Sequence, residues 1–273
     1  MEIFLRFPSG KAKALTLSYD DGVIYDQKLI EIMQKYGVKG TFNINSGLFG
    51  QGRRLSEEQV KSLYQNSGME VAIHGLYHFW PNALHGTQIY KEFITDKENL
   101  ENLFGGVVRG MAYAQGVYTD EVINALKEIG IVYGRTVTDN LRPFDLPTDW
   151  LTIKPTCKHT SPRLKELTNL FIDTDPDKQR NKQPMMFYLW GHSYEFEDAN
   201  NWGLIEDFCK TVGNREDIWY ATNIEIYDYV KAFDSLAFSV DGTKVYNPSA
   251  TDVYLRVGGT TCVAYAGKTT KIR

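Results

Sequence analysis

Apolar runs alternate with amphipathic segments along the first 233 residues of the chain. Short runs rich in β-branched and aromatic residues predict strands at residues 12–19, 39–45, 69–73, 107–113, 131–137, 184–190 and 218–221. Segments with apolar residues at helical spacing predict helices at residues 26–36, 56–65, 87–104, 119–129, 161–171, 202–212 and 224–233. This alternation predicts parallel strands joined by crossover helices.

Polar residues follow directly after several of the predicted strands. Strand–helix alternation fits both an open sheet and a closed one, but this placement favours a (β/α) barrel, because the carboxyl ends of barrel strands form its active face. We therefore expect an α/β barrel over residues 1–233, with catalytic residues on the loops that follow the strands.

The pattern changes after residue 233. Asp241-Gly242 and Gly258-Gly259 each separate two runs of alternating polar and apolar residues, and both dipeptides favour two-residue hairpin turns. We predict a small antiparallel β extension at residues 234–273. We expect this extension to cover part of the barrel, with sugar binding as an alternative role.

Composition excludes some classes of partner. The formal charge is −4, which argues against nucleic acid, because phosphate binding needs a basic surface. No apolar run is long enough to span a membrane. The N-terminus has no apparent signal peptide, so the chain as given reads as cytoplasmic, although a secreted chain after signal cleavage would read the same way. Cys157, Cys209 and Cys262 are far apart, and we expect buried free thiols.

Two carboxylates stand together after the first predicted strand, in the segment SYDDG at residues 18–22. Adjacent side chains of an extended segment point in opposite directions. Asp20 and Asp21 can therefore have different tasks, one binding a metal while the other stays free as a base. An ordinary aspartate-rich turn is the alternative.

Two histidines, His74 and His78, follow the third predicted strand. If their segment makes a helical turn, residues four apart lie on one face, where two neutral imidazoles can bind the same ion. With one aspartate they leave coordination positions open for water and substrate, as a catalytic metal requires. A structural histidine beside a solvated one is the alternative.

A third candidate, His192, follows the apolar run that ends at Trp190. A lone histidine after a strand is more often structural than catalytic. In a barrel, however, His192 would lie on the same face as the two clusters above.

Together these motifs resemble those of the polysaccharide deacetylases, also called carbohydrate esterase family four or the NodB-homology domain. The resemblance runs from about residue 13 to residue 233. SYDDG resembles the family's Thr-Phe-Asp-Asp-Gly motif, and residues 74–78 resemble His-(Ser/Thr)-x-x-His, with Gly75 in the Ser/Thr place. Asp149-Trp150 resembles a shortened Asp-x-Asp-Trp motif, and residues 190–192 stand where the family has Leu-x-His.

The resemblance implies a distorted (β/α) barrel of about seven parallel strands. It also implies a hydrolase that removes N- or O-linked acetyl groups from an acetylated oligo- or polysaccharide. Asp20 would be the general base and His192 the general acid. Asp21, His74 and His78 would bind one divalent ion, usually zinc, with cobalt, nickel or iron as substitutes. Such an ion would polarise the acetyl carbonyl.

The family's third motif, Arg-x-Pro-(Tyr/Phe), is altered here. Aligned on Gly116, which we prefer, Ala-Gln replaces Pro-Tyr, so the backbone N–H for the oxyanion would come from Gln115 and the aromatic wall from Tyr113. Aligned on Arg109, the tyrosine comes one place late. Arg109 would reach Asp20 from a different point, with a surface arginine as the alternative.

Two more residues receive roles from the resemblance. Trp150 would form one side of the acetyl pocket, with packing in the core as the alternative. Asp149 would orient His192 and stabilise its protonated form, and Glu195 is the alternative for this role.

Two other functions compete with deacetylation. One is hydrolysis of the C–N bond of a non-sugar amide or cyclic amide, and the other is glycan binding by a module with a vestigial site. A vestigial site would usually have lost at least one of the five predicted metal-binding and catalytic residues, and here all five are present.

Overall fold

A curled sheet of parallel strands forms the centre of the molecule, whose computed structural model describes residues 2–273. The strand order is β6-β5-β4-β3-β2-β8-β7, and β9 pairs with the amino end of β2. The strands are β2 (Lys13–Asp20), β3 (Gly40–Ile44), β4 (Glu70–Ile73), β5 (Gly110–Ala112), β6 (Tyr133–Arg135), β7 (Cys157–Lys158), β8 (Met185–Gly191) and β9 (Ile218–Tyr220). Seven of them curl through 236° into an open barrel, which confirms the predicted architecture.

The predicted strands match the observed strands of this sheet, in which β7 is the one that the pattern missed. It has only two residues, which pair with Leu189 and Trp190 of β8. β2 and β8 are buried along their whole length, as expected for strands covered on both faces. Along β8, Phe187 belongs to the core under the helices and Tyr188 to the cluster on the opposite face of the sheet.

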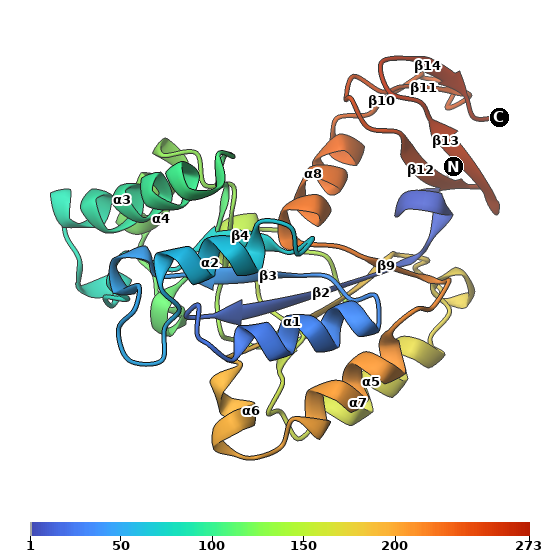
Figure 1. Ribbon diagram of the computed structural model, residues 1–273. Helices are drawn as coiled ribbons and strands as arrows, with labels where there is room; N and C mark the ends of the chain where they lie inside the picture. The colour runs from blue at the N-terminus through green and yellow to red at the C-terminus, as the bar shows by residue number, and fades with distance from the viewer. Residues whose placement is uncertain (1) are drawn as a thin grey trace.

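The helices are α1 (Asp26–Lys35), α2 (Glu57–Tyr64), α3 (Thr87–Phe104), α4 (Asp120–Glu128), α5 (Leu164–Asp173), α6 (Tyr194–Asp198), α7 (Gly203–Val212) and α8 (Asn223–Asp234). Those from α1 to α7 cover the outer face of the sheet (Figure 1), whereas α8 packs with the cluster on the opposite face. Only the five-residue α6 was not predicted. Ser56 and Thr222 begin α2 and α8 with capping boxes, which satisfy backbone N–H groups at the helix start.

The C-terminal residues form the predicted antiparallel extension. Its strands are β10 (Ala237–Phe238), β11 (Lys244–Tyr246), β12 (Val253–Val257), β13 (Thr260–Ala264) and β14 (Thr269–Lys271). Gly258-Gly259 forms the turn between β12 and β13, with Val257 opposite Thr260. The extension lies at the end of the barrel opposite to the one that β2 points toward (Figure 1), so it does not border the loops after the strands.

One strand of the extension comes from the other end of the chain. β1 (Ile3–Arg6) pairs antiparallel with β12, and Leu5 lies opposite Leu255. Arg6 is fully buried and forms an ion pair with Asp177. The pattern did not predict β1, and residues 234–273 therefore build the extension together with the first strand.

The predicted state of the cysteines is confirmed in part. All three are free thiols; Cys157 and Cys209 are buried, and Cys262 is partly exposed. Among residues 2–273, no helix combines the length and apolar character needed to cross a bilayer.

Candidate metal centre and active site

Two loops bring Asp21, His74 and His78 together at the carboxyl ends of β2 and β4. Ligand atoms of the three side chains all lie within 4.8 Å of one another. His78 Nε2 is 3.8 Å from Asp21 Oδ1, and the rings of His74 and His78 meet edge to face at 4.8 Å. Within residues 2–273, this is the only such cluster of potential ligands.

The backbone at these positions is unusual. Asp21 has φ 85° and His78 has φ 59°, values that non-glycine residues rarely adopt and that concentrate at functional sites. Gly75 has φ 84°, and a Cβ there would lie 2.9 Å from Glu92 Oε1. This explains why a glycine replaces the family's Ser or Thr at this position.

His74 has the tautomer that a metal ligand needs. Its Nδ1 lies 2.7 Å from the carbonyl oxygen of Ala112. Because a carbonyl can only accept, Nδ1 carries the proton and Nε2 keeps its lone pair for an ion. Burial and the neighbouring His74 lower the pKa of His78 to about 4, so the His78 ring is neutral near pH 7. The donor set therefore fits a divalent cation.

Asp20 points to the other side of its strand, into the barrel, where it is 2% exposed. Arg135 donates to both of its carboxylate oxygens, and Asn43 donates to Oδ1 at 2.8 Å. Burial alone would raise the pKa of Asp20, but Arg135 and two histidines outweigh burial and lower it to about 2. Asp20 Oδ2 lies 3.8 Å from His74 Nε2 and 3.9 Å from His192 Nε2.

A second carboxylate, Glu195, lies behind His192. One oxygen of Glu195 lies 3.4 Å from His192 Nδ1, and the other lies 2.9 Å from Nε2 of the buried His159. Lys158 donates to Glu195 at 2.6 Å. Burial lowers the pKa of His192, but Glu195 and Asp20 outweigh it, and the net shift is upward. His192 thus keeps its proton to a higher pH than an ordinary histidine.

Part of the chain matches a known protein family. Residues 8–134 match the model of the polysaccharide deacetylase family. This match covers a little under half of the chain and shows that this part resembles the family. The matched segment contains Asp20, Asp21, His74 and His78, whereas His192 and Glu195 lie outside it.

One curated protein of similar sequence is "Putative polysaccharide deacetylase YxkH" of Bacillus subtilis (strain 168). The two are 28% identical over 125 residues, which is 45% of this chain and 44% of YxkH. The chain thus spans less than half the length of this curated relative.

Two solved structures share the fold over more of the chain. One, titled a putative polysaccharide deacetylase from Mycobacterium smegmatis, has a TM-score of 0.62 and 16% identity over 84% of this chain and 94% of its own. The other is a CE4 family pseudoenzyme from Bacillus anthracis, with a TM-score of 0.50 and 17% identity over 81% of this chain and 67% of its own.

The structure corrects the predicted partner of Asp20. Arg109 precedes β5 and therefore lies at the amino end of the barrel, where it pairs with the exposed Asp228 of α8. Its predicted role beside Asp20 is wrong. Arg135 takes that place because it ends β6 in register with Ala112, the last residue of β5.

The predicted role of Asp149 is also wrong. Its carboxylate accepts from Leu151 N at 2.9 Å and from the Thr152 hydroxyl at 2.7 Å, so it caps its own turn. The alternative, Glu195, is the carboxylate beside His192.

Two predicted aromatic positions have structural contacts instead. Trp150 packs edge to face against Tyr227 of α8 at 5.1 Å, and the Tyr113 hydroxyl, fully buried, donates to Leu151 O at 2.8 Å. Neither forms the predicted wall of an acetyl pocket. Two other aromatic residues border the site. The guanidinium of Arg135 lies 4.6 Å from the centre of the Trp190 ring, and the rings of Trp190 and Tyr194 lie 5.9 Å and 5.1 Å from that of His192.

The predicted role of Gln115 as the donor to the oxyanion stays a prediction. It is exposed and has φ 57° in the turn after β5, and Gly116 N closes that turn by donating to Tyr113 O at 2.8 Å. A role for the Gln115 N–H at the oxyanion remains an expectation from the family motif.

Hydrogen bonds to Asp26 link the loops that follow β2 and β8. Its buried carboxyl should make the stability of the fold depend on pH. It accepts from Val23 N, the Tyr64 hydroxyl and the Ser193 hydroxyl. Burial raises its pKa to about 7, above its ordinary value. Asp26 therefore favours folding fully at low pH, and this contribution is lost as pH rises through about 7.

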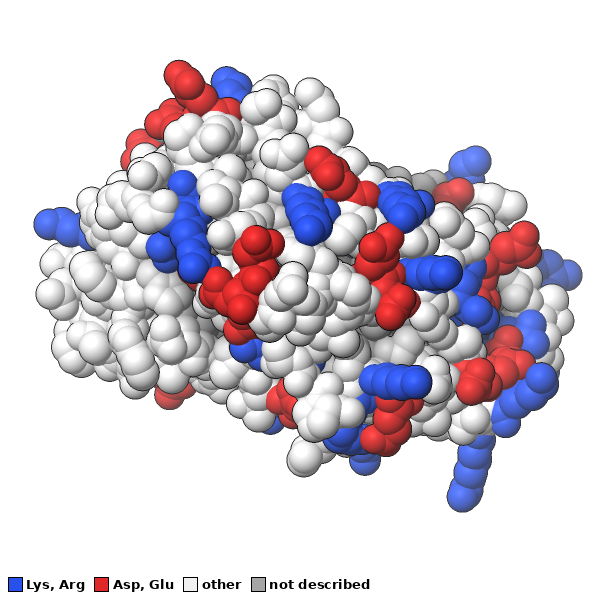
Figure 2. All heavy atoms as spheres, turned by 60° about the horizontal axis from the view of Figure 1, so that its bottom comes forward, with Lys and Arg blue, Asp and Glu red and all other residues white. Residues whose placement is uncertain are grey.

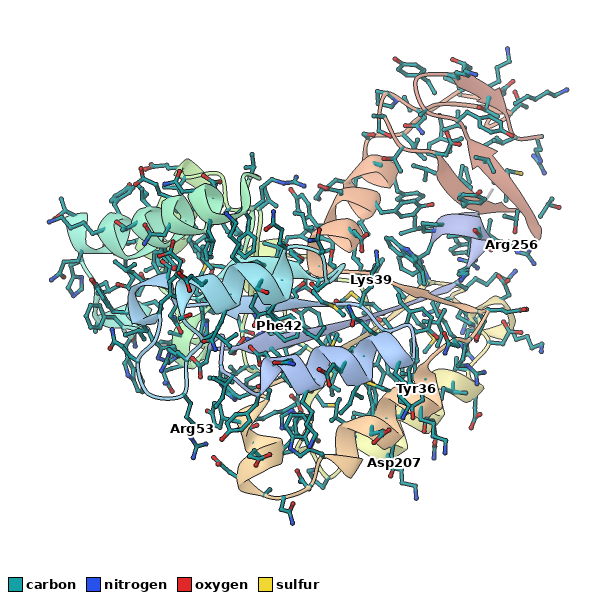
Figure 3. All side chains as sticks on the ribbon, viewed as in Figure 1. Tyr36, Lys39, Phe42, Arg53, Asp207 and Arg256 are labelled. Carbon is teal, nitrogen blue, oxygen red and sulfur yellow. The ribbon has the colours of Figure 1, made fainter. Side chains whose placement is uncertain are left out.

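Asp26→Asn is expected to remove this pH dependence, because the amide imitates the protonated acid. Between pH 5 and pH 7, ionisation of this carboxyl should lower the unfolding free energy of the wild type by about 1.4 kcal/mol per pH unit. The variant should not show this decrease. Urea unfolding at pH 5 and pH 8 would measure the difference. Asp207→Asn, at a residue on the outer side of α7 (Figure 3), is the control. Equal pH dependence in Asp26→Asn and the wild type would contradict the prediction.

Proposed function

We propose that this chain removes acetyl groups from a carbohydrate, using one divalent ion held by Asp21, His74 and His78. The observation that carries the proposal is the convergence of these three ligands within 4.8 Å beside a separate buried aspartate. Two tasks, holding an ion and accepting a proton, thereby fall to adjacent residues. The family match to residues 8–134 supports the same activity.

The ion, when bound, supplies Lewis acidity to the acetyl carbonyl and the attacking water. Zinc suits two histidines and one carboxylate, and cobalt, nickel or iron would suit them as well.

The side chains of the site account for the proton transfers. Asp20, kept ionised by Arg135, accepts a proton from the attacking water. His192, kept protonated by Glu195, donates a proton to the departing nitrogen or oxygen. The two groups stand 3.9 Å apart at their nearest atoms, so both can reach one small acyl group.

An acetyl amide and an acetyl ester need the same groups, so we propose acetylated oligo- or polysaccharides as the substrate class. N-acetyl and O-acetyl substrates are both included in this proposal.

The test combines metal analysis with acetate release from acetylated xylan, chitin oligomers and peptidoglycan fragments. We expect about one divalent ion per chain. His78→Ala should lose both the ion and the activity, because two ligands rarely hold a catalytic ion. His192→Ala should keep the ion and lose about 10²–10⁴-fold in acetate release, the usual contribution of a general acid.

His85→Ala is the matched control, since this exposed histidine lies on the same loop and pairs only with Glu121. It should keep both ion and activity. A bound ion without acetate release from any substrate would contradict the proposal and favour a non-sugar amide hydrolase or a non-catalytic glycan-binding module.

A further inference from the structure

Three large aromatic side chains are exposed on one short segment beside the metal centre. Tyr77, Phe79 and Trp80 are 48%, 52% and 55% exposed. Single exposed aromatic residues need no explanation, but a contiguous group marks an interaction site more often than chance. The segment is continuous with the motif that supplies His74 and His78, and Tyr77 and Phe79 flank His78 directly.

The segment lies on the active face. The loop between β4 and α3 runs along the left end of the molecule, toward which β2 points (Figure 1). The rings of Tyr77 and Phe79 are 5.7 Å apart. The Tyr77 ring also packs against Gly47 in the loop after β3, where an added Cβ would lie 2.7 Å from the ring. The aromatic group therefore spans the surface between the loops after β3 and β4.

Hydrogen bonds to Glu92 fix the backbone that carries these side chains. Glu92 of α3 is 3% exposed, and its Oε1 accepts from Tyr77 N at 2.9 Å and from Phe79 N at 3.3 Å. Its carbonyl oxygen accepts from Leu76 N at 3.1 Å. Exposed rings on a fixed backbone lose little conformational freedom when they bind, which favours a preformed binding surface.

The lack of charged residues in this loop favours a neutral ligand over a charged one. Residues 75–86 of this loop include no Lys, Arg, Asp or Glu, and a broad area at the lower left of the molecule is free of these residue types (Figure 2). A neutral ligand with both apolar and hydroxyl groups suits rings that combine an apolar body with a polar tip, as Tyr and Trp do. Pyranose rings have this character, because their axial C–H groups form apolar faces.

We propose that Tyr77, Phe79 and Trp80 bind the sugar rings that neighbour the acetylated one in the substrate chain. The inference rests on the proposed function and adds to it a preference for oligomers over single sugars. A carbohydrate whose acetyl group reaches Asp21, His74 and His78 must extend over an adjacent loop, and this loop presents the aromatic group. These three residues touch the chain and not the reacting atoms.

The test compares substrates of different length. Acetate release is measured from N-acetylglucosamine and chitohexaose, and from acetylated xylose and acetylated xylohexaose. In Phe79→Ala and Trp80→Ala, KM for the hexamer should rise about tenfold relative to KM for the single sugar, the size expected for one lost aromatic contact. kcat for the hexamer should change much less, and bound metal should equal that of the wild type.

Tyr265→Ala, at a 50% exposed tyrosine of the distant β extension, is the matched control and should leave both KM values unchanged. An equal change of KM for hexamer and single sugar, or no change, would overturn the proposal. So would a wild-type dimer that Trp80→Ala dissociates in sedimentation, because the aromatic group would then be an interface between copies.

A failure of the proposed function is distinguishable from a failure of this inference. If the wild type releases no acetate, hexamer binding is measured by calorimetry with the metal-loaded protein. Binding that Trp80→Ala weakens and Tyr265→Ala does not would support the aromatic surface in a non-catalytic protein. Absence of hexamer binding would overturn it.

Discussion

Arg135→Met should lose most acetate release and much of the stability of the fold. Arg135 is fully buried and holds both oxygens of the buried Asp20. Removing one partner of a buried ion pair typically costs about 3–5 kcal/mol, because the other charge stays buried without compensation. Burial then raises the pKa of Asp20, and a protonated Asp20 cannot accept a proton. Activity should fall by about 10²–10⁴-fold at pH 7, the usual contribution of a general base.

Urea unfolding and acetate release at several pH values check this result. Arg109→Met is the matched control, because it removes an arginine whose ion pair with Asp228 is exposed; such pairs contribute about 0–1 kcal/mol. Arg135→Lys keeps the charge on a shorter side chain that would have to replace the contacts of Nη2 with both Asp20 oxygens, so it should fall between the wild type and Arg135→Met. Comparable behaviour of Arg109→Met and Arg135→Met would show that Arg135 has no special role.

Glu195→Gln should shift the alkaline limb of the pH–rate profile to lower pH. Glu195 opposes the effect of burial on His192 and raises its pKa. Without this charge, burial favours the neutral ring more strongly. We expect the limb to move down by about 1 in pH, the lower end of the effect of a neighbouring charge. At a pH above the limb, acetate release should then be about tenfold lower than in the wild type.

Measurement of kcat/KM between pH 5 and pH 10 separates this effect from a general loss of structure, which would lower the whole profile without moving it. Glu197→Gln, in the same helix α6 but bound to Trp202, is the control and should leave the limb in place. A profile of Glu195→Gln that overlies the wild type would exclude Glu195 as the group that sets the pKa of His192.

The parts of the fold that could be predicted from sequence are those with a strong local pattern. Long buried strands such as β2 and β8, and helices with an amphipathic face, have a hydrophobic period that extends over many residues. Strand β7 is too short to form a pattern. Strand β1 depends on pairing with β12, about 250 residues away in the chain, and no local signal carries such a contact.

The same distinction separates the predicted site residues. Asp20, Asp21, His74, His78 and His192 each follow a predictable strand, and the structure brings all five together. The partner of Asp20 depends instead on the register between β5 and β6. An arginine two residues after the buried Tyr133, near the end of a predicted strand, was the available signal, because alternate residues face the same side. Choosing between Arg109 and Arg135 required knowing which end of the barrel each one occupies.

The pairing of β1 with β12 has a consequence for attempts to isolate the catalytic part. A chain cut after residue 233 would leave the edge of β1 unpaired and Leu5 without its cover from Leu255. Such a fragment would expose a strand edge that favours aggregation, so insolubility of a shortened chain would say nothing about its chemistry. Both chain ends lie near this extension, far from the loops that carry Asp21, His74 and His78 (Figure 1). An affinity tag or fused partner at either end should therefore leave these loops accessible.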